Sequence, residues 1–214
     1  MGDWINMTIR EKITAVLLAT ERPGIENLLD HMEEIGYFTA PCSGGNHLAK
    51  RGGLAEHHWN VNTIMDTDAN MKLDEDEYMD MVPSISITSL LHDIGKCGDY
   101  GKPNYVENLI KDGRPTKAEP EQKYKISESK PYKTNPDLLY VPHEVRSVKI
   151  ISKFIELTED EEFAILYHNG LYSHLGYDLK GKETPLYLLL HHADMWASRV
   201  VEKEGVEDGN STEN

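Results

Sequence analysis

The sequence predicts an all-α fold: a helical bundle interrupted by one long irregular insertion. Residues 8–96 and 142–204 carry apolar residues at the three- and four-residue spacing of helices that bury one face. Residues 97–141 lack this period, are rich in proline, and hold eight of the 22 basic residues. We therefore expect one domain over 1–204 that includes the 97–141 insertion, followed by a flexible acidic tail at 205–214.

The first two helices are expected to form a hairpin. Residues 8–20 show a helical apolar stripe, and Pro23 lies where a proline suits the first turn of a second helix. That helix runs to about Glu34 and is stopped by Gly36.

A loop rich in Gly over 38–53 then leads into a helix at 54–70. The acidic run 74–80 is expected to be a short solvated helical turn. Pro83 is expected to begin a separate buried helix over 84–96, because its apolar residues are too dense for a surface element.

The insertion at 97–141 is too long for an ordinary connection, and such loops are usually functional lids or disordered insertions. Within it, residues 124–126 and 130–134 are expected to pair as a short β-hairpin across 127–129.

Helical signals return at Pro142, and the apolar stripe comprises Val145, Val148, Ile151 and Ile155. Thr158 and Glu161 form a capping box at the start of the next helix. A last helix is expected over 185–204.

Composition narrows the function classes. A net charge of −15 disfavours broad binding to nucleic acids, whose phosphates need a basic surface. No stretch reaches the roughly 20 apolar residues needed to cross a bilayer, so no membrane association is expected. The two cysteines, Cys42 and Cys97, suggest neither a disulfide framework nor a thiolate metal site, and a cytoplasmic protein fits best. A homo-oligomer stays an open alternative.

Six polar residues lie where the predicted helices should be buried, and they come from five different helices. Imidazoles and carboxylates are the ligands of borderline divalent metals, and helices of a bundle can bring such groups to one point. The sequence therefore predicts a metal site whose ligand candidates are His57, His92, Asp93, His143, His168 and Asp194.

The same residues stand in short segments whose order is characteristic. The segments are Gly-Gly-Leu-Ala-Glu-His (52–57), Leu-Leu-His-Asp-Ile-Gly-Lys (90–96), His143, Tyr-His-Asn-Gly (167–170) and His-Ala-Asp-Met (192–195). In this order they resemble the HD-domain superfamily of metal-dependent phosphohydrolases, and more closely the small HD hydrolases of Firmicutes and their phages.

The resemblance implies an HD-domain helical bundle with one or two divalent ions per chain, with Mn, Fe, Co, Ni and Mg as candidates. A first ion would be held by His57, His92, Asp93 and Asp194. A second would be held by His143 and His168 and bridged by Asp93. A metal-activated water would then cleave the phosphate ester of a nucleotide or a related compound.

Two further residues are expected to contact substrate. Lys96 lies one helical turn beyond Asp93, so its ammonium group can hold a phosphate oxygen or assist the leaving group, which makes Asp93 and Lys96 the catalytic candidates. His47, ten residues before His57, is assigned to substrate contact. Both ends of the insertion adjoin the expected site, so the insertion is expected to lie over or near its mouth as a lid.

Other readings stay open at this point. The Gly-Tyr-Pro element of HD enzymes that cleave cyclic dinucleotides is missing, and Lys96 occupies the neighbourhood where 5′-nucleotidases carry a glutamate. Triphosphohydrolase, monophosphatase and phosphodiesterase activities are unresolved. Outside this class, a di-iron HD-type oxygenase and a non-catalytic nucleotide-binding sensor are the alternatives.

Overall fold

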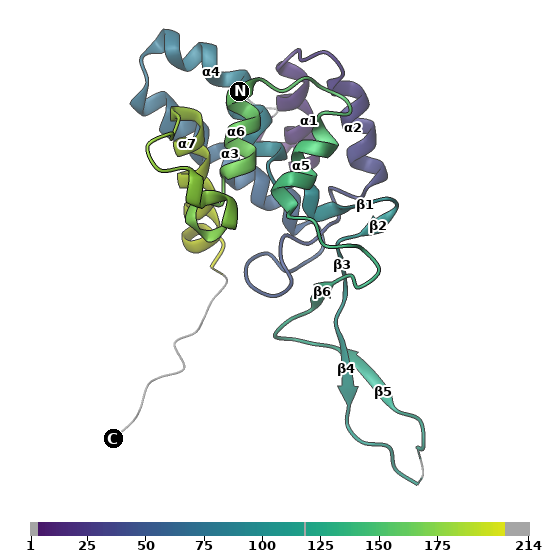
Figure 1. The fold of residues 1–214 in the computed structure, drawn as a ribbon. Helices are drawn as coiled ribbons and strands as arrows, with labels where there is room; N and C mark the ends of the chain where they lie inside the picture. Colours follow the sequence, from purple (N-terminus) through teal and green to yellow (C-terminus); the bar gives the residue numbers. More distant parts are fainter. Residues whose placement is uncertain (1–3, 118, 204–214) are drawn as a thin grey trace, which may run out of the picture.

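The predicted helical fold is confirmed by the computed structural model, which describes residues 4–117 and 119–203. The expected tail at 205–214 lies outside the described residues. The α-helices of the described chain are α1 (Ile9–Ala19), α2 (Ile25–Glu34), α3 (Gly53–Lys72), α4 (Glu75–Leu91), α5 (His143–Ile151), α6 (Glu159–Tyr167) and α7 (Pro185–Trp196) (Figure 1).

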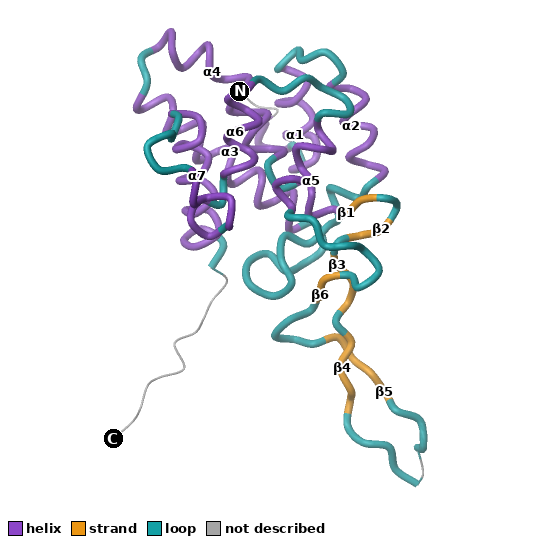
Figure 2. Tube along the Cα trace, in the orientation of Figure 1, coloured by secondary structure: helices purple, strands orange, loops and turns teal. Residues whose placement is uncertain are grey.

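The strands of the described chain are short and lie in the insertion between α4 and α5, where Figure 2 draws them in orange. They are β1 (Gly98–Asp99), β2 (Lys102–Pro103), β3 (Tyr105–Glu107), β4 (Leu109–Asp112), β5 (Lys123–Ile126) and β6 (Tyr132–Thr134). Each belongs to a two-stranded antiparallel ladder, and the pairs are β1–β2, β3–β6 and β4–β5.

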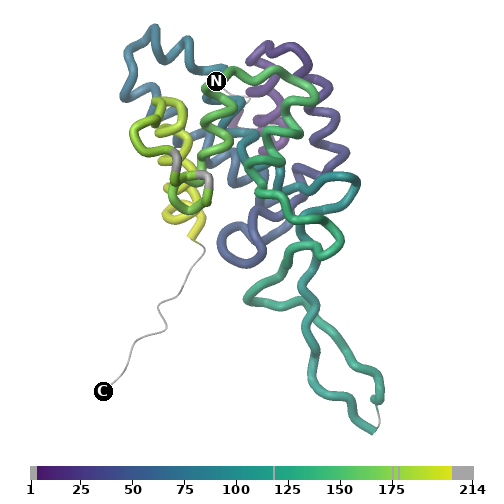
Figure 3. The backbone as a smooth tube through the Cα atoms, viewed as in Figure 1, coloured from purple at the N-terminus to yellow at the C-terminus, as the bar shows by residue number. Residues whose placement is uncertain are grey.

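Helices distant in sequence pack side by side around the core. Figure 3 shows α7, drawn in yellow, beside α3, although α4, the insertion, α5 and α6 separate them along the chain. Two clusters of buried apolar side chains fill the body, and residues of both α3 and α4 belong to each of them. These two helices therefore connect the halves of the core. No helix in the described part of the chain is long and apolar enough to span a bilayer.

Local capping signals place several helices as expected. Thr8 caps α1 and Thr158 caps α6, each through a capping box with the glutamate three residues on, Glu11 and Glu161. α2 begins at Ile25, two residues later than expected, after a turn that includes Pro23.

The expectation that Pro83 begins a helix is wrong. α4 starts at Glu75 behind an Asp74 capping box and continues through Pro83, so the acidic run forms its first turns. A proline inside a helix removes one N–H and leaves the carbonyl four residues earlier without its partner. Here that residue is Met79, which is 61 % exposed, so water can reach the carbonyl and the break is tolerated.

The end of α4 also differs from the expectation. The α-helix stops at Leu91, His92 is its C-cap, and Asp93 has φ −108° and ψ 10°, outside the helical region. A 3₁₀ turn, Ile94–Cys97, follows. His92 and Asp93 therefore sit at a break between two helical segments, which separates the directions of their side chains.

The expected hairpin across 127–129 has the wrong partners. β5 pairs with β4, with Leu109 opposite Ile126, and β6 pairs with β3, with Tyr105 opposite Thr134. Between the two ladders Asn108 donates from its amide side chain to the Lys130 carbonyl. The partners lie well back in the sequence, and no local turn signal identifies them.

The insertion has an inner and an outer part. β1, β2, β3 and β6 adjoin the helical body, whereas β4 and β5 project away from it as an arm (Figure 1). In this structure the arm does not cover the helical body, so the expected lid position is not taken by the outer part.

The last helix is shorter than expected and changes type. α7 ends at Trp196 and continues as a π-helical segment, Ala197–Val201, to Glu202. The expected end at 204 lies outside the described residues.

A buried ion pair ties the turn before α2 to α6. Glu161 has no exposed side-chain surface and accepts two hydrogen bonds from the Arg22 guanidinium, at 2.7 and 2.9 Å. Ser84 and the Thr158 amide also donate to it. Burial alone would raise the pKa of Glu161, but these donors outweigh burial and lower it.

Arg22→Ala should destabilise the fold by about 3 kcal/mol, because it leaves a buried carboxylate without its cation. Urea unfolding followed by circular dichroism measures the change. Arg22 stabilises the ionised form of Glu161, which is why the pKa of Glu161 is lowered. The difference in unfolding free energy between variant and wild type should therefore be complete at neutral pH and shrink as the pH falls through that pKa. Arg10→Ala is the control: its pair with Glu33 is exposed and should contribute less than about 1 kcal/mol. Equal losses in the two variants would contradict the assignment.

Candidate metal centre

A cluster of polar side chains lies inside the helical body, and the structure brings together all the ligand candidates predicted from the sequence. They come from α3, the end of α4, α5, the end of α6 and α7: His57, His92, Asp93, His143, His168 and Asp194. The side chains of His143 and Asp194 are 29 % and 17 % exposed, whereas the other four are at most 1 % exposed. The cluster is therefore buried on the core side and open where His143 and Asp194 lie.

Asp93 stands at the centre of this cluster. Its Oδ1 lies 3.0 Å from His143 Nε2 and 3.5 Å from His168 Nε2. Its Oδ2 lies 3.6 Å from His92 Nε2 and 3.9 Å from His57 Nε2. One carboxylate thus faces four imidazoles, which is the arrangement expected of a ligand shared by two positions.

The imidazoles are held from behind by their other nitrogen. His92 Nδ1 lies 3.0 Å from the Ser89 carbonyl, and His168 Nδ1 lies 2.7 Å from the Ile165 carbonyl. A carbonyl only accepts, so each Nδ1 carries the proton and each Nε2 presents a lone pair to the centre. Both histidines are C-caps, where the last carbonyls of a helix lack backbone partners, so the helix ends themselves orient the rings.

His57 is held in the same way by a carboxylate that sequence reasoning missed. Its Nδ1 lies 3.0 Å from both oxygens of Glu202, which also accepts from Asn60 Nδ2 at 3.0 Å. Ligand imidazoles commonly donate their outer N–H to a carboxylate, which fixes the tautomer and strengthens the ligand.

Glu202 reaches this position through the π-helical segment. A π-turn holds about one residue more than an α-turn of 3.6 residues, so one turn of each spans about eight residues. Eight is the separation of Asp194 and Glu202, so both carboxylates can lie on the same face as His57. Nothing in the sequence signals a π-turn, and an acidic residue near an acidic chain end gave no indication of burial.

Four buried side-chain atoms in and next to the cluster lack a hydrogen bond of acceptable geometry among the described residues. They are His57 Nε2, His92 Nε2 and Asp93 Oδ1 of the cluster, and Nε2 of the neighbouring His58. Buried polar atoms are almost always satisfied, and leaving them unpaired costs roughly 1–3 kcal/mol each. Nitrogen and oxygen atoms whose lone pairs converge on one point are the ligands that a metal cation would bind.

The charges point to the same chemistry. Burial lowers the pKa of His92 to about 3, so it stays neutral. Burial also disfavours charge on His57, but Cys42, Asp194 and Glu202 outweigh it and raise the pKa of His57 well above its ordinary value. The carboxylates thus favour positive charge at this point, whether a proton or a metal ion carries it.

The residues present fit a divalent metal ion. Imidazole nitrogens and carboxylate oxygens suit Mn, Fe, Co, Ni or Zn, and the ligand atoms lie within 4.8 Å of one another in overlapping groups. His57, His92 and Asp93 make one group, and Asp93, His143 and His168 make another. The buried cluster could therefore hold a metal ion.

The position of His143 depends on a close approach that only glycine permits. A Cβ on Gly95 would lie 2.2 Å from the His143 carbonyl, and the Gly95 amide donates to Ser147 Oγ at 2.9 Å. Arg146 Nη1 donates to the Gly95 carbonyl and to Asn104. The start of α5 is thereby pressed against the 3₁₀ turn that follows Asp93.

Lys96 reaches the centre but not with a free ammonium group. It belongs to the 3₁₀ turn, and its Nζ lies 2.5 Å from Asp93 Oδ2. Burial disfavours its charge, yet Asp93 outweighs burial and raises the pKa of Lys96. Its side chain is 16 % exposed, so it borders the open side of the cluster while it neutralises Asp93.

His47 lies next to the His57 ring, and its expected contact with substrate stays a prediction. Its Nε2 is 3.3 Å from Cys42 Sγ and 3.8 Å from Glu202 Oε2. Cys42, His47 and His57 form a further group of possible ligand atoms, although the sequence suggested no thiolate site.

Asn169 is the second residue that sequence reasoning missed, although it belongs to the Tyr-His-Asn-Gly segment that drew attention to His168. Its Nδ2 lies 3.1 Å from His143 Nε2 and 3.0 Å from His168 Nε2. An amide N–H₂ can donate to both lone pairs, so Asn169 satisfies the pair of imidazoles that a second ion would need. That ion would have to displace this amide.

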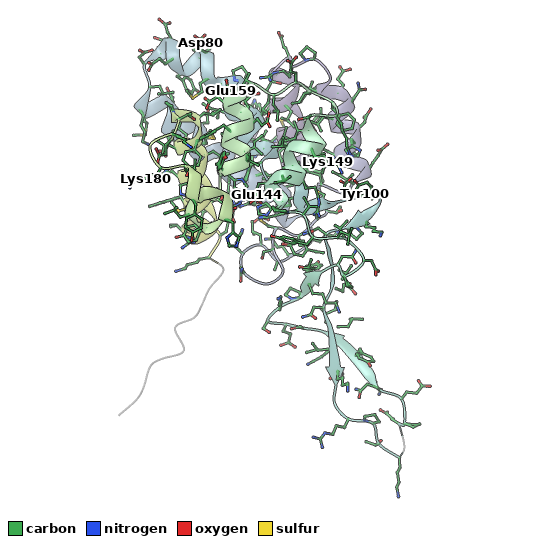
Figure 4. All side chains as sticks on the ribbon, viewed as in Figure 1. Asp80, Tyr100, Glu144, Lys149, Glu159 and Lys180 are labelled. Carbon is green, nitrogen blue, oxygen red and sulfur yellow. The ribbon has the colours of Figure 1, made fainter. Side chains whose placement is uncertain are left out.

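Glu144, labelled in Figure 4, is the second residue of α5 and follows His143 directly. Its Oε2 lies 3.2 Å from His143 Nδ1, and its Oε1 accepts from Ser173. His143 is thus held from behind like the other imidazoles.

Comparisons of the chain with protein-family models, with curated proteins and with solved structures found no match.

Proposed function

We propose that this protein is an HD-domain phosphohydrolase that uses one or two divalent metal ions to cleave a phosphate ester of a nucleotide or a related compound. The observation that carries the proposal is the convergence of four imidazoles and Asp93, with each imidazole held at Nδ1 and turned inward at Nε2. The order of the ligand segments resembles that of HD hydrolases, and from this resemblance we infer that the reaction is phosphate ester hydrolysis.

A divalent ion held by this set would bind phosphate oxygens and lower the pKa of a water molecule, which supplies the nucleophile for hydrolysis. Residues of the chain set the charge and the solvent access of this site. Asp93 brings negative charge to the centre, and Lys96 compensates it from the open side. The buried imidazoles exclude bulk water on the core side, and the partly exposed His143 and Asp194 lie on the side from which a phosphate would approach.

The proposal is tested by loading purified protein with Mn, Fe, Co, Ni or Mg in turn and supplying a panel of nucleoside mono-, di- and triphosphates and cyclic dinucleotides. Phosphate and nucleoside products are both quantified, because product identity separates monophosphatase, triphosphohydrolase and phosphodiesterase activities. Hydrolysis of at least one compound with at least one metal is expected. Oxygen-dependent turnover with two irons and no phosphate release would replace the proposal with an oxygenase, and tight nucleotide binding without turnover would replace it with a sensor.

Asp93→Ala should lose at least 100-fold in kcat/KM and most of the bound metal, because Asp93 is the ligand that all four imidazoles face. Hydrolysis and metal content by mass spectrometry are measured on the same sample, with Asp93→Asn as a variant of nearly unchanged volume. Asp68→Ala is the control, since this carboxylate pairs with Lys72 and His192 on the surface. Full metal content in both Asp93 variants would sink the ligand assignment.

His168→Ala distinguishes one metal from two. If the second position is occupied, the variant should fall from two ions per chain to one and lose activity. If only one ion binds, stoichiometry stays at one, because His57, His92, Asp93 and Asp194 are intact. Equilibrium dialysis with Mn or Co counts the ions.

Glu202→Gln should weaken metal binding about 10- to 100-fold, because the glutamine no longer fixes and polarises His57 as a carboxylate does. The titration of Co by its visible absorption measures the affinity without any substrate. Glu33→Gln, which changes an exposed carboxylate, should bind like the wild type. A Glu202 variant with unchanged affinity would show that the carboxylate is not part of the centre.

A further inference from the structure

A small polar cavity lies where the inner part of the insertion meets the loop before α3. One wall is formed by Gly44, Gly45 and Asn46, and the other includes Tyr105, Lys130 and Lys133. Its volume is about 310 Å³, at the lower end for ligand sites. The cavity therefore suits a small group rather than a whole nucleotide.

The walls of this cavity are built for a close approach. A Cβ on Gly45 would lie 3.0 Å from both Lys130 Cα and the Ser129 carbonyl, and a Cβ on Gly44 would lie 3.0 Å from the Tyr132 carbonyl. The Tyr132 amide donates to the Gly44 carbonyl at 3.1 Å. Glycine at these positions lets the loop and the inner strands meet without side chains between them.

The chemistry of the lining is cationic. No aspartate or glutamate lines the cavity, although acidic residues outnumber basic ones by 37 to 22 in the chain. Lys130 lies along the glycine turn, with its Cε 3.4 Å from the place of a Gly44 Cβ. Neither Lys130 nor Lys133 forms an ion pair with a described residue. Two unpaired ammonium groups in an acidic protein form a local site for an anion.

Two residues that line the cavity relate it to the metal cluster. Asn46 lines the cavity, and its neighbour His47 reaches Cys42 and Glu202 beside His57. Tyr105 lines the other wall. Burial raises its pKa, while the charge of Lys96 lowers it and the weaker effect of Asp93 raises it, so charges of the cluster reach this side chain. A molecule whose scissile phosphate lies at the metal cluster can therefore place a further anionic group in the cavity.

We propose that this cavity binds a second phosphate group of the substrate, so that the substrate is a nucleoside di- or triphosphate or a compound with comparable phosphates rather than a monophosphate. This inference rests on the proposed phosphohydrolase function and narrows it. Lys130 and Lys133 are the specificity-determining residues, and the glycine turn sets the shape of the wall.

The test compares the double variant Lys130→Ala/Lys133→Ala with the wild type, both loaded with metal. Binding of a methylene-bridged, non-hydrolysable analogue of adenosine triphosphate and of adenosine monophosphate is measured by calorimetry. The double variant should bind the triphosphate analogue at least tenfold more weakly, because it loses two charge-assisted contacts, and the monophosphate as well as the wild type does. Metal content and circular dichroism confirm that the centre and the fold are unchanged.

The double variant Lys111→Ala/Lys123→Ala is the matched control, because it removes two charges from the arm formed by β4 and β5, outside the cavity. It should bind both compounds like the wild type. Equal weakening in the two double variants would overturn the inference in favour of a general field of the insertion. Unchanged triphosphate binding in Lys130→Ala/Lys133→Ala, or a wild type that binds the monophosphate as tightly as the triphosphate analogue, would also overturn it.

Failure of the proposed function gives a different result. If no phosphate compound is hydrolysed but the two double variants still differ in triphosphate binding, the cavity is a phosphate site and the hydrolase proposal alone fails.

Discussion

A carboxylate buried in a helical core must be met by positive charge or by hydrogen-bond donors, and Asp93 imposes this constraint on the whole structure. It is 1 % exposed, and an isolated charge there would cost several kcal/mol. Five elements turn imidazoles or an ammonium group toward it. The break at the end of α4, the glycine contact with α5 and the C-caps of α4 and α6 all follow from placing these groups around one point.

The same constraint explains why the helix ends matter more than the helix bodies. His92 and His168 both cap a helix, so each donates its outer N–H to a carbonyl that lacks a backbone partner. The same hydrogen bond gives the helix carbonyl a partner and orients the imidazole ring. His57 is the fifth residue of α3, far from the helix C-terminus where carbonyls lack partners, and a separate carboxylate, Glu202, serves the same purpose.

Charge is distributed unevenly, and the function we propose depends on this. A chain with a net charge of −15 repels phosphate compounds over most of its surface. Lys96 compensates the charge of Asp93 at the open side of the cluster, and Lys130 and Lys133 place unpaired positive charge at the cavity. The two lysines at the cavity both come from the insertion.

The sequence by itself determined the helices that begin at strong caps, such as those after Thr8 and Thr158. It also determined which polar residues lie on helix faces that the apolar pattern predicts to be buried. Both are properties of residues close together in the chain, so periodicity and capping reveal them. Only the tertiary structure decided that Pro83 lies inside a helix, that β5 pairs with β4, and that Glu202 and Asn169 join the cluster. These outcomes depend on atoms brought together from distant segments, and their distances are set by the packing of the whole core rather than by any local pattern.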